Sequence, residues 1–334
     1  MTGSMRAVLC RAHGDYRDVR VEDCPRPIPA VGQVLIEVRA AGVSFANILA
    51  IAGRHQNRAE PPFIPGTEAA GIVRACGPGV ADLVPGQRVM AAMPNGAFAE
   101  EAVAMADLTF PIPDALGFAA ATLFPTIYGT AYTALAVEAR LEPGETLLVH
   151  GAAGASGLAA VQVGKAHGAR VLACGSSPEK RAVARDAGAD EVLPAEAFRD
   201  AVLALTGGRG ADVVFDPVGG DAFDQSLRCV APEGRILAIG FASGRIPQIP
   251  ANLLLVKNVA VLGVYWGYYT GWARMPPSDR ARRRVRDGFA ALFDLFGAGR
   301  IHPRVQAELP LERFAEALSI VEGRGAIGKV VLVP

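Results

Sequence analysis

The sequence has no excess of charge of either sign. Its 334 residues contain 33 Lys+Arg and 33 Asp+Glu, so the formal net charge at pH 7 is zero. A chain without net charge has no general attraction for nucleic acid or for an anionic membrane surface, although a local phosphate site remains open. We therefore expect no membrane partner and consider a nucleic-acid partner unlikely.

Long apolar runs and clustered cysteines are also missing. No apolar run reaches the roughly 18 residues that can cross a bilayer, and the N-terminal segment MTGSMRAVLCRAHG lacks the apolar core of a signal peptide. The five cysteines are scattered and form no CxxC pair, which is typical of free thiols in a reducing compartment. These absences predict a cytoplasmic location.

The pattern of apolar, Gly and Pro residues changes twice along the chain, which predicts that one domain is inserted within another. Residues 1–121 alternate short apolar runs with Gly and Pro, as in a compact β domain. Residues 122–262 alternate short buried strands with helices, as in the βαβ units of a parallel sheet. Residues 263–334 return to mixed texture and end in a predicted strand, Lys329–Val333, that would join the first domain's sheet.

A glycine-rich turn follows the predicted strand Thr146–His150. The segment Gly151–Gly157 is a variant of GxGxxG with Ala152 in place of the first glycine, and a helix is predicted over Leu158–Ala166. Such a turn lets backbone approach a pyrophosphate, and the helix start offers free N–H groups. The strand–turn–helix context favours a dinucleotide site over a plain packing turn.

The end of the next strand favours NADPH over NADH. An NAD site usually has an acidic residue about 20 residues beyond the glycine turn, whereas this strand ends in Cys174-Gly175-Ser176. Ser176 can donate a hydrogen bond to a 2′-phosphate, and Lys180 and Arg181 add positive charge. Alternatively, Ser177 caps a helix that begins at Pro178, and the two cations are solvated.

Several segments together resemble the medium-chain dehydrogenase/reductase superfamily, and its NADPH:quinone oxidoreductase (ζ-crystallin-like) branch in particular. The resemblance covers nearly the whole chain. The matching segments are Pro65–Gly71, Gly77–Val80 with Pro85–Val89, Gly151–Gly157, Asp216–Gly220 and Gly328–Leu332.

This resemblance implies a doubly wound Rossmann sheet domain inserted in a GroES-like β-rich catalytic domain, and a homodimer formed through the Rossmann sheet. It also implies NADPH as the cofactor. The residues that would contact it are Thr130, Ala153, Gly154, Ala155, Ser156, Ser176, Lys180, Val218, Gly240, Phe241, Ser243, Val264, Tyr265, Trp266 and Lys329.

The resemblance also bears on zinc. Zinc-dependent members of the superfamily need a Cys, a His and a second Cys or Asp, and the corresponding positions here are Ser44, Thr67 and Thr126. None is a usual zinc ligand, and the four-cysteine loop that binds structural zinc is absent. We therefore expect no metal. Without a Lewis acid, the acceptor should delocalise its own charge, as quinones and activated alkenes do.

Three residues are candidates for contact with the acceptor. Asn47 could bind a carbonyl oxygen or cap a helix predicted over Ile48–Ala52. His55 could donate a proton or could be an ordinary loop histidine. Tyr128 could form an aromatic wall for a flat acceptor, or could simply pack in the core.

The sequence supports three functions. The first is NADPH-dependent hydride transfer to a quinone. The second is reduction of activated C=C bonds in enones or 2-enoyl thioesters. The third is a non-catalytic NADPH- or RNA-binding protein, since Arg280–Arg286 is a basic run that could bind RNA or coenzyme A phosphates, although a solvated helix surface is the main expectation.

Overall fold

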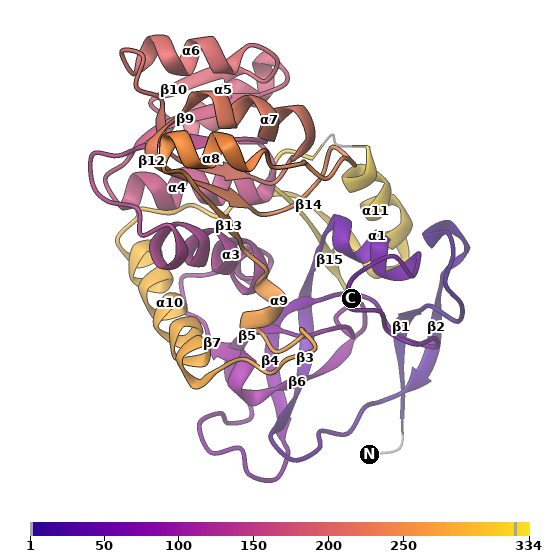
Figure 1. Ribbon diagram of the computed structural model, residues 1–334. Helices are drawn as coiled ribbons and strands as arrows, with labels where there is room; N and C mark the ends of the chain where they lie inside the picture. Colours follow the sequence, from indigo (N-terminus) through magenta and orange to yellow (C-terminus); the bar gives the residue numbers. More distant parts are fainter. Residues whose placement is uncertain (1–2, 324–325) are drawn as a thin grey trace. The chain divides into compact units, whose positions relative to one another are not determined.

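A computed structural model describes residues 3–323 and 326–334. Contacts divide the chain into two units, each assembled from separate stretches of sequence (Figure 1). The β-rich unit contains the chain up to Thr126, the segment Gly267–Ser278 and the chain from Pro303 onward. The Rossmann unit contains Ile127–Trp266 and Asp279–His302. A nucleotide-binding fold is thus inserted into a β-rich unit, as the sequence predicted.

The β-rich unit is built on a seven-stranded sheet in the order β14-β15-β3-β4-β5-β7, with β6 also paired to β3. Strand β15 lies between β14 and β3, which confirms that the predicted strand joins this sheet. Its strands are β3 (Gln33–Val43), β4 (Glu68–Cys76), β5 (Arg88–Ala92), β6 (Glu101–Met105), β7 (Thr109–Pro111), β14 (Val305–Pro310) and β15 (Lys329–Val333); β1 (Ser4–Leu9) and β2 (Arg20–Pro25) form a separate pair.

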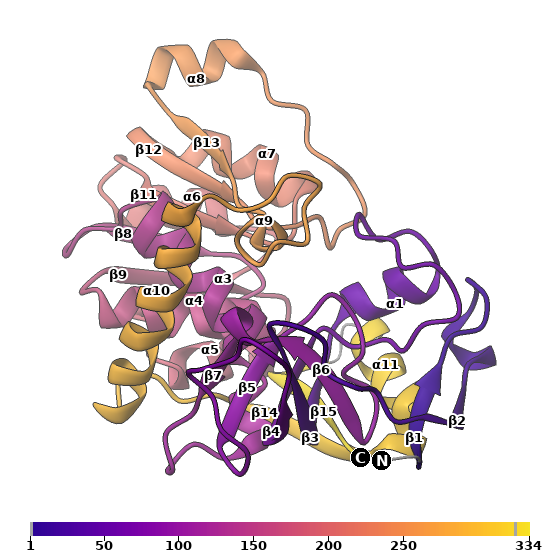
Figure 2. The ribbon, with the colours of Figure 1, turned by 90° about the horizontal axis from the view of Figure 1, so that it is seen from below.

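Helices α1 and α11 pack against one another beside this sheet, and both ribbon views show them together (Figures 1 and 2). Apolar side chains from the strands and from α11 form the core of the unit, including Val34, Ile36, Phe98, Leu318 and Val330. The helical segments are α1 (Phe45–Ile51), α2 (Phe118–Ala121) and α11 (Phe314–Glu322), with the short turns η1 (Tyr16–Asp18), η2 (Ala106–Leu108) and η5 (Leu311–Arg313).

The Rossmann unit has a parallel six-stranded sheet in the order β10-β9-β8-β11-β12-β13. The order reverses at β8, because the chain first adds β9 and β10 on one side and then β11, β12 and β13 on the other. The strands are β8 (Thr146–Val149), β9 (Arg170–Gly175), β10 (Glu191–Pro194), β11 (Ala211–Asp216), β12 (Val230–Ala238) and β13 (Ala260–Gly263).

Helices connect these strands and cover the sheet. Helix α4 packs on β8 and β9, whereas α7 packs on β11 and β12 and also contacts α6. The connecting helices are α4 (Ala155–Ala166), α5 (Pro178–Asp186), α6 (Phe198–Leu205), α7 (Gly220–Cys229) and α8 (Ala251–Lys257). The others are α3 (Gly129–Tyr132), η4 (Thr133–Glu138) and α10 (Asp279–Gly297). Two short helices span a boundary between the units: η3 (Phe124–Tyr128), which belongs to the β-rich unit up to Thr126, and α9 (Trp266–Tyr269), which belongs to it from Gly267 onward. None of the described helices is both long and apolar enough to span a membrane.

The grouping by contacts differs from the sequence boundaries at three places, one of which is the end of the first Rossmann stretch at Trp266 rather than at residue 262. The chain first passes between units after Thr126 rather than after residue 121. Helix α10 groups with the Rossmann unit, whereas the sequence placed it in the remainder 263–334. The reason is packing, because α10 buries Val285, Phe289 and Leu292 and contacts α3 and η4.

Candidate functional site

The glycine-rich bend lies at the carboxyl end of β8, where the strand order reverses. Gly151 has a positive φ of 59°, and the Gly154 N–H donates to the Gly151 carbonyl at 3.0 Å. Helix α4 then begins at Ala155 with Gly154 as its N-cap, and no side chain caps it. The first N–H groups of α4 are thus left for a ligand, and open α/β sheets bind ligands at such a reversal.

Gly157 is required by close packing. A Cβ at this position would lie 2.3 Å from the Gly151 carbonyl oxygen and 2.6 Å from the Ala152 Cα. By contrast, a Cβ at Gly154 would meet only the Gly151 oxygen, at 3.4 Å. Gly157 therefore lets α4 approach the bend, which is the role of the last glycine of a dinucleotide-binding turn.

A second turn, after β11, packs beside the bend. Asp216 is 1% exposed, and its Oδ1 accepts from the N–H groups of Val218 (2.8 Å) and Gly219 (3.0 Å). Its Oδ2 is buried and has no partner in the described residues, and burial raises the pKa of this carboxyl. A Cβ on Gly151 would touch Pro217 and Val218, each at 3.6 Å. The two turns therefore form one edge of the sheet.

The loop after β12 is held against this second turn. Ala242 N donates to the Pro217 carbonyl at 3.1 Å, and Ser243 N donates to the Val218 carbonyl at 2.9 Å. The structure thus places five of the predicted cofactor residues at one edge of the sheet. Ser156 belongs to the bend, and Val218, Gly240, Phe241 and Ser243 lie beside it. Val264 extends this edge, because its N–H donates to the Ala238 carbonyl at 3.1 Å.

The end of β9 carries the predicted phosphate contacts. Ser176 is exposed and Lys180 half-buried. Ser177 caps α5 by accepting from Lys180 N at 3.2 Å, and Pro178 occupies the first turn. The cap therefore belongs to Ser177, and the hydroxyl of Ser176 lies outside it. Arg181 donates to the Gly175 carbonyl at 3.0 Å, so its guanidinium stays at the strand end.

In the β-rich unit, two of the expected acceptor residues lie in and after α1. Helix α1 begins at Phe45 rather than at Ile48, so Asn47 lies inside its first turn. Asn47 Oδ1 accepts from the backbone N–H (2.7 Å) and hydroxyl (3.0 Å) of Ser44, which is the capping alternative. Asn47 Nδ2 remains buried without a partner in the described residues. A buried donor without a partner costs about 1–3 kcal/mol, so it needs an explanation.

His55 is half-buried beyond the end of α1. Its Nδ1 lies 3.1 Å from the backbone nitrogen and 3.1 Å from the carbonyl oxygen of Asn57. Nδ1 accepts from the N–H in one tautomer and donates to the carbonyl in the other. In the tautomer whose Nδ1 accepts, Nε2 carries the proton and is the donor on the far side of the ring.

A buried ion pair lies at the ends of three strands of the same unit. The Lys329 ammonium donates to the Glu68 carboxylate, and the Thr126 hydroxyl donates to the other oxygen of that carboxylate. Lys329 is 2% exposed and Glu68 0%. The register pairs Val43 with Val330 and Ala41 with Ala69, which puts both charges beside Gly42. A Cβ at Gly42 would lie 2.4 Å from Glu68 Oε1.

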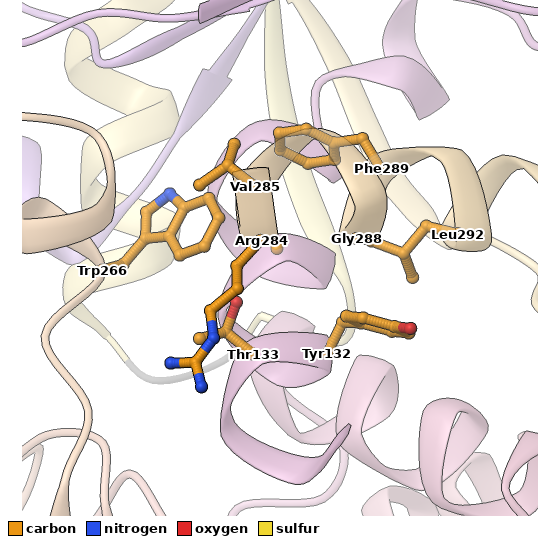
Figure 3. Close-up of a pocket in the computed structure, with 9 residues that line it drawn as sticks. Tyr132, Thr133, Trp266, Arg284, Val285, Gly288, Phe289 and Leu292 are labelled. Carbon is orange, nitrogen blue, oxygen red and sulfur yellow. The ribbon is translucent and has the colours of Figure 1, made fainter. Parts of the chain in front are cut away.

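Tyr128 lies within the Rossmann unit and turns inward. It is 1% exposed, and its hydroxyl donates to Gln162 Oε1 at 2.7 Å. Burial raises the pKa of the phenol. Thr130 follows in α3 and is half-buried, and Trp266 lines a narrow crevice with Thr133, Arg284 and Phe289 (Figure 3). Tyr265, in contrast, is 41% exposed.

Comparison with known proteins places this geometry in a family. Residues 30–114 match the alcohol dehydrogenase GroES-like domain, and residues 155–278 match a model described as zinc-binding dehydrogenase. A quinone oxidoreductase-like protein 2 homolog from Nematostella vectensis is 38% identical, covering 98% of this chain and 89% of its own length. The chain belongs to the quinone oxidoreductase-like medium-chain dehydrogenases/reductases. It is therefore an enzyme of the oxidoreductase class.

Two further relatives are informative about this reductase. A 2-haloacrylate reductase from a Burkholderia species is 32% identical, covering 92% of each chain. The mycobacterial protein Rv1454c was solved as a complex with NADPH. It is 33% identical, with a TM-score of 0.90 over 99% of this chain and 100% of its own.

The catalytic zinc of some relatives does not fit the residues of this reductase. Ser44 and Thr126 are occupied by Asn47 and Glu68, and Thr67 offers only a hydroxyl. Across residues 3–323 and 326–334, no group of three His, Cys, Asp or Glu side chains is placed to hold a metal ion. The model described as zinc-binding covers residues 155–278, which include none of these three positions.

Sequence reasoning did not identify four features: the buried Glu68, the buried Gln162, the contact of Arg181 with the end of β9, and the Asp216 oxygen that has no partner in the described residues. For Glu68 the sequence did contain a signal. Glu68 and Lys329 are charged residues that open otherwise apolar strands, and such residues are rarely buried unless they are paired. Gln162 carries no comparable signal, since it is one polar residue on a helix that is otherwise largely apolar.

Proposed function

We propose that this reductase oxidises NADPH and transfers the hydride to a quinone without a metal. The observation that carries the proposal is the uncapped start of α4 beside the Gly151–Gly157 bend, joined to the Asp216 turn at the reversal of strand order. When bound, NADPH supplies a hydride. The NADPH complex of Rv1454c and the quinone oxidoreductase-like name of the anemone relative support the assignment.

The cofactor residues have distinct roles in this proposal. The backbone of Ala153–Ser156 holds the pyrophosphate, because the N–H groups and dipole of α4 favour a negative charge there. Ser176 and Lys180 hold the 2′-phosphate, and no carboxylate in Cys174–Pro178 opposes it. Val218, Gly240, Phe241 and Ser243 line the dinucleotide. Thr130, Val264, Tyr265, Trp266 and Lys329 complete the proposed set.

Two of the three acceptor candidates have geometry that suits a hydrogen-bond donor. His55 offers Nε2–H in the tautomer whose Nδ1 accepts from Asn57, and Asn47 offers an amide donor held in orientation by Ser44. Either would stabilise charge on an acceptor oxygen. Asn47 Nδ2 is fully covered in the described structure, so we place His55 first. Tyr128 ranks last, because its hydroxyl is already held by Gln162.

A second candidate function is reduction of an activated C=C bond. The 2-haloacrylate reductase at 32% identity favours it, since that protein's name describes an acceptor of this kind. The atoms balance when the alkene takes a hydride from NADPH and a proton from water, which yields the saturated product and NADP⁺. The same donors would then hold the conjugated carbonyl oxygen.

The test is a panel of acceptors followed by NADPH absorbance at 340 nm. We expect turnover with 1,4-benzoquinone and naphthoquinones, a slower reaction with enones, and little turnover with simple ketones. His55→Ala should lower kcat, and His55→Gln should recover part of it. NADPH binding without oxidation by any acceptor would instead identify a non-catalytic binding protein.

We also propose a homodimer through the Rossmann sheet. Strand β13 is an edge with a partner on one side only within the described residues, and exposed edges are usually covered. Leu255 and Val256 of α8 are 78% and 74% exposed, and Ile246 is 64% exposed. A second copy would cover both features. Sedimentation of Leu255→Glu should give a monomer where the natural chain gives a dimer.

The five cysteines are all free thiols, three of them buried. Free thiols persist in a reducing environment, and this supports a cytoplasmic location. Fractionation of cells that express a tagged chain would test it.

A further inference from the structure

The start of α10 is a basic surface. Five of the seven residues from Arg280 to Arg286 are arginine, in a chain whose charges otherwise balance. Ala281 and Val285 bury the inner face of the helix. Four arginines point outward and are exposed, whereas Arg284 is half-buried beside Glu138. We call Arg280, Arg283 and Arg286 the arginine surface.

The arginine surface differs from the rest of the molecule in its partners. At least twelve arginines elsewhere form ion pairs with carboxylates in the described structure. None of the three guanidinium groups of the arginine surface has an ion pair or side-chain hydrogen bond with a described residue. Asp279 and Asp287, the nearest acids in sequence, are two carboxylates beside the three arginines of this surface.

The position of these charges is unfavourable to the helix itself. They occupy the first two turns, where the helix dipole places partial positive charge and where acidic residues are preferred. Arg280 and Arg283, and Arg283 and Arg286, are also three residues apart, so like charges face one another. A negative ligand at this place would offset both costs.

The arginine surface leads to the predicted nicotinamide region within the same unit. Arg284 and Val285 line the crevice that contains Trp266 and Thr133, and the Arg284 side chain extends past Thr133 with Trp266 on its other side (Figure 3). The crevice is too narrow to admit a ligand itself. Residues 280–286, which include two of the residues that line the crevice, span about 9 Å along the helix at 1.5 Å per residue.

We propose that the arginine surface binds the phosphate groups of coenzyme A, so that the reductase accepts 2-enoyl-coenzyme A thioesters. Guanidinium groups bind phosphate oxygens through paired hydrogen bonds, and a row of three matches a ligand with several phosphates. The inference rests on the second candidate function, NADPH-dependent reduction of an activated C=C bond, and specifies the acceptor of that reaction. The enoyl double bond takes a hydride from NADPH and a proton from water, which gives the saturated thioester and NADP⁺.

The test compares two thioesters that differ in their phosphates. Crotonyl-coenzyme A carries them, and crotonyl-N-acetylcysteamine does not. In Arg280→Gln/Arg283→Gln/Arg286→Gln, we expect the KM for crotonyl-coenzyme A to rise by about tenfold or more with kcat little changed. The KM for the neutral thioester and for 1,4-benzoquinone should stay the same. The matched control is Arg185→Gln/Arg228→Gln, which removes two exposed arginines of the same unit.

Other outcomes would overturn the proposal. An unchanged KM for crotonyl-coenzyme A, or an equal rise for both thioesters, would show that the arginine surface does not bind phosphate. A single-stranded RNA that binds tightly and loses affinity in the triple variant, with thioester kinetics unchanged, would assign the surface to nucleic acid.

Calorimetry with free coenzyme A separates this proposal from the proposed function. If the enzyme reduces neither quinone nor thioester but binds coenzyme A through the three arginines, the reductase assignment fails and the phosphate site stands. If quinone is reduced but coenzyme A is not bound, the phosphate site alone fails.

Discussion

The proposed cofactor site of the Rossmann unit and the buried polar cluster of the β-rich unit are built in opposite ways. The proposed cofactor site is made of backbone: the Gly151–Gly157 bend, the start of α4 and the loop bonded to the Asp216 turn. The second is made of side chains that are buried and paired, Glu68 with Lys329 and Thr126. A backbone site is fixed by local sequence and stays open to a ligand. A side-chain cluster depends on distant residues and fills its own space.

Breaking the buried ion pair should have the largest effect on stability. Lys329→Met leaves the Glu68 carboxylate buried without its cation, which costs about 3–5 kcal/mol. Urea unfolding measures the loss. The double variant Lys329→Met/Glu68→Gln should recover most of it, because no unpaired charge then remains. In Arg11→Met the exposed pair with Glu22 is lost, and little or no change in the free energy of unfolding is expected. Equal losses in the two single variants would contradict the contrast between buried and exposed pairs.

The backbone site should be sensitive to a single methyl group. Gly157→Ala places a Cβ 2.3 Å from the Gly151 oxygen, and relief of this clash should cost about 1–3 kcal/mol and move the bend. The dissociation constant of NADPH, followed by fluorescence, should rise by about tenfold or more. Gly154→Ala is the control for stability, since its Cβ makes ordinary contact at 3.4 Å. If both variants unfold at the same urea concentration, close approach is not the reason for Gly157.

His150, directly after β8, links the stability of the Rossmann unit to pH. Burial lowers the pKa of this histidine from 6.5 to about 4, and its Nε2 lies 2.8 Å from Ser226 Oγ. The unfolded chain therefore takes up the proton first as pH falls below 6.5. This contribution is complete above that pH and is lost progressively toward pH 4, with about 2 kcal/mol lost between pH 8 and 5.

Urea unfolding of His150→Asn at both pH values isolates this contribution. The variant should be less stable at pH 8, but its stability should fall less than that of the natural chain on going to pH 5. Parallel curves for the two proteins would exclude His150 as the titrating group.

The smallest effect concerns the choice of cofactor. Lys180→Ala should weaken NADPH binding by about tenfold and change NADH binding by about twofold at most, since only NADPH carries the 2′-phosphate. Arg185→Ala, on the exposed face of the same helix, is the matched control. An equal change for both cofactors would remove the assignment of Lys180.

Sequence reasoning reached the backbone site because glycine spacing, strand pattern and helix start lie within a dozen residues. The predicted strand over Lys329–Val333 and the inserted parallel sheet are confirmed by the structure. Helix α4 begins three residues earlier than predicted, since Ala155–Gly157 have helical geometry but no apolar periodicity. The assignment of individual residues to cofactor and acceptor stays a prediction.

The side-chain cluster was out of reach for a different reason. Its members are separated by up to 261 residues, and only the register of β3 with β4 and β15 brings them together. Asn47 illustrates the same limit. Capping was one of its two predicted alternatives, but the bond to Ser44 that fixes its amide required the true start of α1 at Phe45.

The place of β15 in its sheet has a consequence for biosynthesis. This strand lies between β14 and β3, and it supplies the cation that Glu68 needs. On the ribosome, β3 and β4 therefore emerge long before the partners that complete them, whereas β8 to β13 follow one another within about 120 residues. We therefore expect the Rossmann unit to fold first during translation. Until β15 is made, β3 has an unpaired edge and the Glu68 carboxylate lacks its cation.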